Sequence, residues 1–357
     1  MKIAKKILKI TAIVLAVLLF IVGGYVAYVF IAFHRLGDYS LTAYGNVDKR
    51  AAVGQEYTVV SYNVGFGAYE QDYDFFMDGG KKSWATSKED LDANLKNITS
   101  LLKSRNADIY LIQEVDFDST RTYHVDEREY FISALDGKSY TFAQNYDSPF
   151  LFYPIFEPHG ASRSGIMTFS DFTITSAERK ELPIETGLTK LLDLDRCYSK
   201  NRTAVENGKE LVIYTFHLSA YTSDGTIANE QLKILLSDMQ REYELGNYCV
   251  AGGDFNKDLL GDSSKYFGEN NEQYTWAQPI PSEIFEGLDI TLVAPIDEAA
   301  PVPSCRNADS PYHDGQYVIT IDGFLHSPNV LSLGASVIDT QFLYSDHNPV
   351  TLDFKLL

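Results

Sequence analysis

The sequence of 357 residues is long enough for one large domain or two ordinary ones, and 45% of its residues are hydrophobic. Its 24 tyrosines and 21 phenylalanines exclude a disordered chain. The formal net charge of −19 repels nucleic acid at long range, which disfavours strong nonspecific DNA binding without excluding a local basic groove.

An uncharged apolar stretch over residues 10–33 follows four lysines in the first nine residues. About 20 such residues span a bilayer, and Tyr25 and Tyr28 suit an interfacial aromatic belt. The lysines predict a cytoplasmic N-terminus and an extracytoplasmic remainder of the chain. The alternative is a cleaved signal peptide, whose apolar region is shorter, about 7–15 residues, and ends in a small-residue cleavage site. We expect residues 1–33 to form an uncleaved single-pass transmembrane signal-anchor.

The next stretch, residues 34–56, mixes Gly, Asp, Asn and Lys and predicts a short tether. Residues 57–357 contain no internal repeat, low-complexity tract or second linker. We therefore expect them to form one catalytic domain.

Apolar runs that end in a polar residue begin this domain. Residues 57–63 are rich in β-branched and aromatic residues and end in Asn63, and residues 108–114 predict a similar strand ending in Glu114. Between them, apolar residues recur at helical spacing up to about residue 106, behind a Ser-x-x-Asp helix start. This strand–helix–strand pattern is typical of α/β architecture.

The middle of the domain continues with strands and one helix. Residues 140–183 alternate short apolar runs with turn residues, which indicates a β-rich section. Residues 211–217 predict a strand ending in His217, and residues 229–245 predict a helix.

A buried strand over residues 248–251 leads to two glycines, which we expect to form a tight turn. That turn presents Asp254 and Asn256 on the same side of an extended chain. Further on, residues 317–322 predict a strand that ends in Asp322.

Asp346 and His347 come shortly before the last predicted strand, residues 351–357. Strand ends in a packed sheet can converge on one rim, where these side chains would combine oxygen ligands with two histidines. The set comprises Asn63, Glu114, His217, Asp254, Asn256, Asp322, Asp346 and His347. Its oxygen-rich character favours Mg²⁺ or Mn²⁺ over Zn²⁺ and suits metal-assisted attack of water on phosphorus.

Six ordered segments resemble the motifs of the endonuclease/exonuclease/phosphatase superfamily, which includes pancreatic-type deoxyribonucleases, bacterial sphingomyelinases and inositol-polyphosphate phosphatases. These segments are Ser61-Tyr62-Asn63, Gln113-Glu114, His217-Leu218, Gly253-Asp254-Phe255-Asn256, Ile321-Asp322 and Ser345-Asp346-His347. The match covers nearly all of residues 57–357. It implies an α/β (α+β) fold, a four-layer αββα sandwich with two sheets face to face and helices outside.

The resemblance also implies how the metal and the water are held. Glu114 is expected to be the principal metal ligand, with Asn63 and Asp346 beside the metal. Asp254 is expected to orient the attacking water, and Asn256 to hold the scissile phosphate.

Proton handling is implied in the same way. Asp322 is expected to hydrogen-bond His347 and fix its tautomer, so that His347 acts as general base or as a transition-state donor. His217 is expected to stabilise or protonate the departing oxygen, as in the sphingomyelinase, deoxyribonuclease and inositol-phosphatase branch.

Three arginines, Arg163, Arg202 and Arg306, are further candidates, since a guanidinium can bind phosphate with two hydrogen bonds. Of the three cysteines, Cys249 is expected to be a packed thiol, whereas Cys197 and Cys305 lie in polar stretches and could pair outside the cell.

The sequence therefore predicts a divalent-metal-dependent phosphoesterase, a hydrolase that acts on a phospholipid head group, a small phosphoester or nucleic acid at the outer membrane surface. The alternatives are an extracytoplasmic endo- or exonuclease and a catalytically silent, membrane-tethered binding module. Apart from the membrane at the N-terminal helix, no protein partner is evident. We see no obvious exposed aromatic hairpin for membrane insertion, which weighs against a sphingomyelinase.

Overall fold

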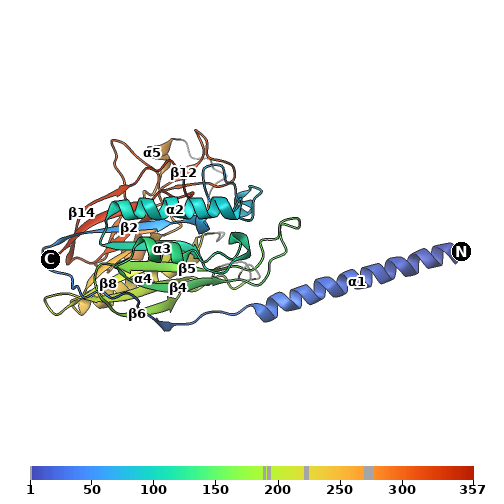
Figure 1. Ribbon diagram of the computed structural model, residues 1–357, viewed down its shortest axis with the longest axis horizontal. Helices are drawn as coiled ribbons and strands as arrows, with labels where there is room; N and C mark the ends of the chain where they lie inside the picture. Colours follow the sequence, from blue (N-terminus) through green and yellow to red (C-terminus); the bar gives the residue numbers. More distant parts are fainter. Residues whose placement is uncertain (1, 188–189, 191–193, 221–224, 269–275) are drawn as a thin grey trace.

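A computed structural model describes residues 2–187, 190, 194–220, 225–268 and 276–357. In these residues, two β-sheets lie face to face (Figure 1). The seven-stranded sheet contains, in spatial order, β1 (Tyr39–Leu41), β6 (Ile174–Glu181), β7 (Cys197–Ala204), β8 (Glu210–His217), β9 (Tyr248–Asp254), β13 (Asp322–His326) and β10 (Thr291–Val293). The six-stranded sheet contains β14 (Val330–Val337), β15 (Val350–Leu356), β2 (Glu56–Asn63), β3 (Ile109–Asp116), β5 (Arg163–Ser170) and β4 (Ser139–Asp147). A separate ribbon pairs β11 (Cys305–Arg306) with β12 (Val318–Ile319).

The space between the sheets is filled by the aliphatic residues of the central strands. Val59 and Leu111 from the six-stranded sheet belong to one buried cluster with Ile213, Val250 and Phe324 from the seven-stranded sheet. Burial of this apolar surface from both sides holds the sheets together.

Helices cover the two outer faces. On the six-stranded sheet, α2 (Lys88–Arg105) and α3 (Arg128–Ala134) pack onto residues of β2, β3 and β5. On the seven-stranded sheet, α4 (Thr226–Glu244) packs onto β8 and β9. This arrangement confirms the expected four-layer αββα sandwich.

Short helical segments connect the layers. They are η1 (Gly65–Gly67), η2 (Phe76–Asp78), η3 (Thr120–Thr122), α5 (Ser264–Phe267) and η5 (Ser282–Phe285). The start of α2 follows the predicted pattern, because the Ser87 hydroxyl accepts a hydrogen bond of 3.0 Å from the Asp90 backbone N–H.

Gly252 and Gly253 lie inside β9, so the expected tight turn is wrong. A Cβ on Gly253 would lie 2.0 Å from the carbonyl oxygen of Phe216 in β8. A Cβ on Gly252 would lie 2.7 Å from Leu111 Cδ1 in the facing sheet. The glycines therefore let β9 approach its neighbours closely, and the straight strand delivers Asp254 to its end.

The N-terminal helix α1 (Lys2–Ala32) projects away from the sandwich (Figure 1). Among the described residues it is the one helix long and apolar enough to cross a membrane. The stretch over residues 34–56, where we expected a tether, contacts both sheets. β1 pairs with β6 of the seven-stranded sheet, and Tyr44 exchanges two backbone hydrogen bonds of 2.9 Å with Tyr140 in β4 of the six-stranded sheet.

Candidate active site

The polar strand ends meet at one rim of the sandwich. β2 and β3 are parallel neighbours, which places Asn63 beside Gln113 and close to Glu114. β8 and β9 are also parallel, and their last residues, His217 and Asp254, are direct partners in register. Because the carboxyl ends of parallel strands share an edge, each pair arrives at the rim together.

Asp322 reaches the rim differently from our expectation, because it begins β13 and does not end a strand. Of the predicted strand over residues 317–322, only β12 forms before it. β13 is antiparallel to β9, so its first residue pairs with Asp254, the last residue of β9. His347 likewise precedes β15, which is antiparallel to β2.

Asn63 is the hub of the hydrogen-bond network. Its Nδ2 donates to Glu114 Oε1 at 2.9 Å and to Asp254 Oδ2 at 3.1 Å. Its Oδ1 accepts from the Gly65 backbone N–H at 3.1 Å. In this arrangement Asn63 holds two carboxylates in place and turns N–H donors, not an oxygen ligand, toward the site.

A β-bulge sets the orientation of the Glu114 side chain. The pairing of β3 with β5 shifts register between Ile112 and Val115, and Glu114 within the bulge has a left-handed φ of 58°. A non-glycine residue in this region is strained, and such strain is typical of functional sites. Burial, with the nearby Asp346 carboxylate, raises the pKa of Glu114. Two neighbouring, partly buried carboxyls of this kind are stabilised in their charged form by a cation.

His347 forms a tight pair with Asp322. Its Nδ1 lies 2.8 Å from Asp322 Oδ2, which also accepts from the Ser304 hydroxyl at 2.7 Å. Burial acts to lower the pKa of His347, but Asp322, Cys305 and Asp346 together raise that pKa well above its usual value. With Nδ1 engaged, Nε2 faces Asp254 Oδ2 at 3.8 Å.

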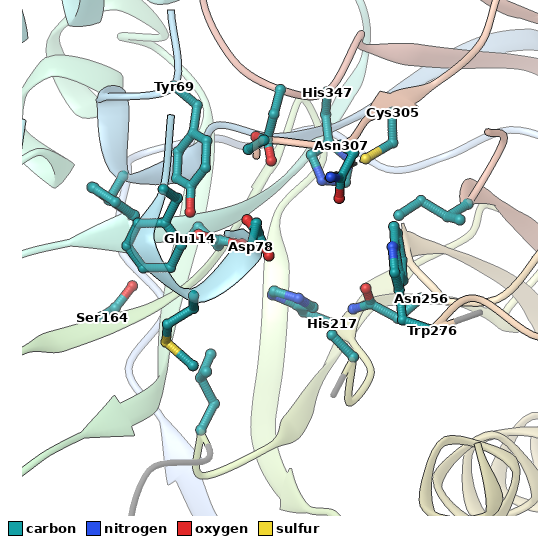
Figure 2. A pocket seen from close by; sticks show the side chains of 18 of the residues that line it. Tyr69, Asp78, Glu114, Ser164, His217, Asn256, Trp276, Cys305, Asn307 and His347 are labelled. Carbon is teal, nitrogen blue, oxygen red and sulfur yellow. Dashed lines mark hydrogen bonds between the residues drawn. The ribbon is translucent and has the colours of Figure 1, made fainter. Parts of the chain in front are cut away.

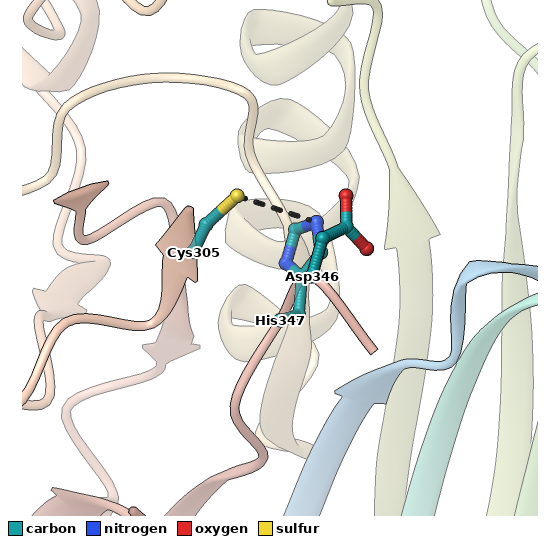
Figure 3. Close-up of side chains that lie close together, drawn as sticks. All are labelled: Cys305, Asp346 and His347. Carbon is teal, nitrogen blue, oxygen red and sulfur yellow. Dashed lines mark hydrogen bonds between the residues drawn. The ribbon is translucent and has the colours of Figure 1, made fainter. Parts of the chain in front are cut away.

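Cys305 is an additional neighbour of this histidine. Its Sγ lies 3.6 Å from His347 Nε2, and Figure 3 shows Cys305, Asp346 and His347 close together. Burial raises the pKa of the Cys305 thiol to about 12, so it is a neutral side chain at pH 7. Cys197 and Cys305 are both free and buried, so the disulfide between them that the sequence left open does not form.

Asp254 and His217 have shifted pKa values for a shared reason. Burial, with the neighbouring Asp322 carboxylate, raises the pKa of Asp254 to about 7. Burial, with the Arg196 guanidinium and His347, lowers the pKa of His217 well below its usual value. His217 is therefore a neutral imidazole at pH 7, with Nε2 3.5 Å from Asp254 Oδ2 and Nδ1 without a hydrogen-bond partner among the described residues.

Asn256 completes the end of β9. It has a left-handed φ of 50°, and its backbone N–H donates to Asp254 Oδ1 at 2.8 Å. Its Nδ2 donates to the Leu218 carbonyl at 2.8 Å, which fixes the side chain beside the pocket.

These groups suit a divalent metal. Ligand-type atoms of Asp254, Asp322 and His347 lie within 4.8 Å of one another, as do those of Cys305, Asp346 and His347. Glu114 and Asp346 are partly buried carboxyls with raised pKa values in the same region. The donors are mostly carboxylate oxygens, which hard cations prefer.

A pocket of about 250 Å³ opens beside this network. Figure 2 shows His217 and His347 facing it, with Glu114 and Tyr69 on one side and Asn256 and Trp276 on the other. Much of the remaining wall is aromatic or apolar, and those residues are Phe66, Phe75, Met77, Tyr146 and Leu194.

The three arginines predicted for phosphate binding are separated by the structure. Arg163 is half-exposed and pairs with Asp118 at 3.4 Å, and Arg202 is engaged with Glu210 and Glu242; neither lines the pocket. Arg306 does line it, but its guanidinium donates to backbone carbonyls, including Glu70 O at 3.0 Å.

Sequence reasoning did not single out Arg121 and Arg196, which also line the pocket. Arg121 binds both oxygens of Asp116 at 2.9 Å, and Arg196 Nη1 lies 3.5 Å from the His217 carbonyl oxygen. Neither lies at a predicted strand end, so no local signal marks them.

The rim of this four-layer sandwich thus brings together carboxylates, an amide and an Asp–His pair. The sequence pattern of the endonuclease/exonuclease/phosphatase family matches residues 60–347. The chain belongs to this family, whose members are phosphoester hydrolases.

Solved structures share the fold. An endonuclease/exonuclease/phosphatase from Beutenbergia cavernae superimposes with a TM-score of 0.59 at 16% identity, over 85% of this chain and 72% of that one. The human Nocturnin catalytic domain superimposes with a TM-score of 0.54 at 18% identity, over 89% of this chain and 97% of that one. ANGEL2, a 2′,3′-cyclic phosphatase, superimposes with a TM-score of 0.56 at 16% identity, over 89% of this chain and 99% of that one. A comparison with curated protein sequences gave no match.

Proposed function

We propose that this protein hydrolyses a phosphoester by attack of water, and that Glu114 and Asp346 would help to hold the Mg²⁺ or Mn²⁺ that assists the reaction. The network that joins Asn63, Glu114, Asp254 and the Asp322–His347 pair beside a pocket is the observation that supports this proposal. When bound, the cation neutralises charge on the phosphoryl oxygens and acts as a Lewis acid.

The chain's own residues then have separate roles. Asp254, with a pKa of about 7, can accept a hydrogen bond or a proton from the attacking water. Protonated His347, held by Asp322, stabilises negative charge on the phosphate. Neutral His217 has a ring nitrogen that can contact the departing oxygen, and Asn256 lies where it can position the phosphate.

The pocket wall favours a small or lipid-borne phosphoester over a polynucleotide. Two of its arginines, Arg121 and Arg306, are engaged by protein acceptors, and the net charge of the chain is −19. Aromatic side chains such as Tyr69 and Trp276 offer apolar contact to the group esterified to the phosphate. With α1 as anchor and the domain outside the cell, such a substrate lies at the outer membrane surface.

The test is metal-dependent release of p-nitrophenol from bis-p-nitrophenyl phosphate by the full chain in detergent. We expect activity with Mg²⁺ or Mn²⁺, loss with chelator, and a decrease of about 10²–10⁴-fold in kcat for Glu114→Gln and for His347→Asn. Asp254→Asn should lower kcat much more than it changes KM. The control is His124→Ala, an exposed histidine paired with Asp118 outside the pocket.

Activity that persists in chelator, or variants as active as the His124→Ala control, would contradict the proposed metal-assisted mechanism. Faster cleavage of DNA than of phospholipid and small diesters would instead favour the alternative function as an endo- or exonuclease. No activity on any of these substrates, in wild type as in the variants, is the result expected of a silent binding module.

A further inference from the structure

The connection between β4 and β5 exposes a run of large apolar side chains. Residues 150–156 carry no charge and read Phe-Leu-Phe-Tyr-Pro-Ile-Phe. Phe152 is 57% exposed, Tyr153 67% and Ile155 77%, and Phe156 is fully exposed. This corrects the expectation that no exposed aromatic hairpin is present. An apolar patch of this kind on a folded surface marks an interaction site.

The patch stays exposed because both limbs of the loop are held by the domain. Leu151 and Gly160 exchange two backbone hydrogen bonds of 3.0 Å. On the second limb, the Ser83 hydroxyl donates to the Glu157 carbonyl at 2.6 Å and Trp84 Nε1 donates to the Pro158 carbonyl at 2.7 Å. These contacts leave the tip between the limbs pointing away from the sandwich.

The first limb also contacts α1. The Tyr25 hydroxyl donates to the Phe150 carbonyl at 3.1 Å, and the Phe150 N–H donates to the Tyr28 hydroxyl at 3.1 Å. The rings of Tyr25 and Phe152 meet edge to face, with centroids 5.0 Å apart. In Figure 1 the loop, in green, projects from the same end of the sandwich as α1.

This contact sets the depth of the loop in a bilayer. Tyr25 and Tyr28 lie within the apolar stretch over residues 10–33, near the end of α1 that joins the domain. Any bilayer that contains this stretch therefore has the loop at its interface, where aromatic side chains are favoured. The apolar surface of α1 and that of the loop are continuous, which points to lipid as the occupant.

We propose that residues 150–156 insert into the lipid–water interface beside α1 and hold the active-site pocket toward the membrane. Tyr153 packs on Phe76 with ring centroids 5.7 Å apart, and the flanking Phe75 and Met77 line the pocket. The inserted loop is thus connected to the pocket wall. It follows that the substrate is a phosphoester carried by a membrane lipid. This consequence rests on the proposed hydrolysis.

Insertion can be measured on the full chain in phosphatidylcholine vesicles. The three native cysteines are buried, so a single introduced cysteine can carry an environment-sensitive fluorophore. We expect the label at Phe156→Cys to emit at shorter wavelength and to be quenched by nitroxide lipids. Leu18→Cys in α1 is the positive control, and Leu333→Cys, an exposed leucine in β14, is the negative control. The loop carries no charge, so insertion should not require anionic lipid.

The outcomes separate cleanly. Quenching at residues 18 and 156, but not at 333, supports the proposal. The proposal is overturned if the label at residue 156 is as exposed to water as the label at residue 333. It is also overturned if the label at residue 18 is not quenched, because α1 would then lie outside the bilayer.

Activity provides a second, independent measurement. Phe152→Ser with Phe156→Ser should lower hydrolysis of a vesicle-borne phosphodiester several-fold and leave a soluble diester unaffected. Leu331→Ser with Leu333→Ser, which removes two exposed leucines of β14, is the matched control. An equal effect on both substrates would overturn the membrane role. If the wild type hydrolysed neither the vesicle-borne nor the soluble diester, the proposed hydrolysis would be refuted. Insertion would still be decided by the fluorescence of the label at residue 156.

Discussion

Asp322 acts on the site through His347 and not by direct contact with the pocket. Its Oδ2 accepts from both His347 and the Ser304 hydroxyl, which fixes the imidazole with Nε2 toward Asp254. The same carboxylate favours the protonated form of the ring, because it lies 2.8 Å from Nδ1 in a buried environment. Asp322 thus contributes to both the orientation and the charge of His347.

Asp322→Asn should therefore lower the pKa of His347. The carboxylate raises this pKa in the wild type, so its removal decreases the protonated fraction at any given pH. An NMR titration of the histidine ring in the metal-free chain measures this change directly. Ser304→Ala, which keeps the carboxylate, should leave the pKa of His347 above its usual value. An identical titration for wild type and Asp322→Asn would contradict this electrostatic role.

At the scale of elements, β9 connects the core to the site. It lies between β8 and β13 and carries Asp254 at its end, and its two glycines allow close contact with both neighbours and the facing sheet. Any side chain at Gly253 meets the backbone of Phe216, which cannot move without disturbing the register that pairs His217 with Asp254.

Gly253→Ala should consequently destabilise the domain by about 1–3 kcal/mol and reduce activity, since the added methyl overpacks the β8–β9 contact. The midpoint of urea denaturation reports the loss of stability. Gly334→Ala in β14 is the matched control, because a Cβ there has no atom within 4 Å. Equal midpoints for the two variants would show that β9 accommodates a side chain.

For the whole molecule, the connection between α1 and the sandwich determines how the helix is joined to the domain. Arg35 Nε donates to Asp195 Oδ1 at 2.8 Å just after α1 ends, and β1 then adds to the edge of the seven-stranded sheet. Together with the contacts of Tyr25 and Tyr28, these bonds join the helix to the domain on two sides.

The four lysines that precede the apolar stretch predict that the domain lies outside the cytoplasm. A membrane-impermeant maleimide should therefore label Leu333→Cys in intact cells, and should label Ile3→Cys only after permeabilisation. The native chain, whose cysteines are buried, is the control for background labelling. The reverse pattern would place the domain in the cytoplasm.

Properties set by neighbouring residues could be predicted from the sequence alone. The apolar stretch, the helix behind Ser87, the strands that end in Asn63 and His217, and the order of the motifs all follow from local composition and periodicity. The family and the four-layer sandwich followed from the ordered motifs, and the comparisons and the structure confirm both.

Tertiary structure decided what depends on partners distant in the chain. The bulge that aims Glu114 exists only in the pairing of β3 with β5, and Asp322 reaches the rim because β13 runs antiparallel to β9. The residues 150–156 form an apolar run, yet contacts at both limbs leave most of their side chains exposed on the protein surface beside α1. Residue types and periodicity determined which groups could do chemistry, whereas strand direction and register, which are non-local, decided where those groups meet.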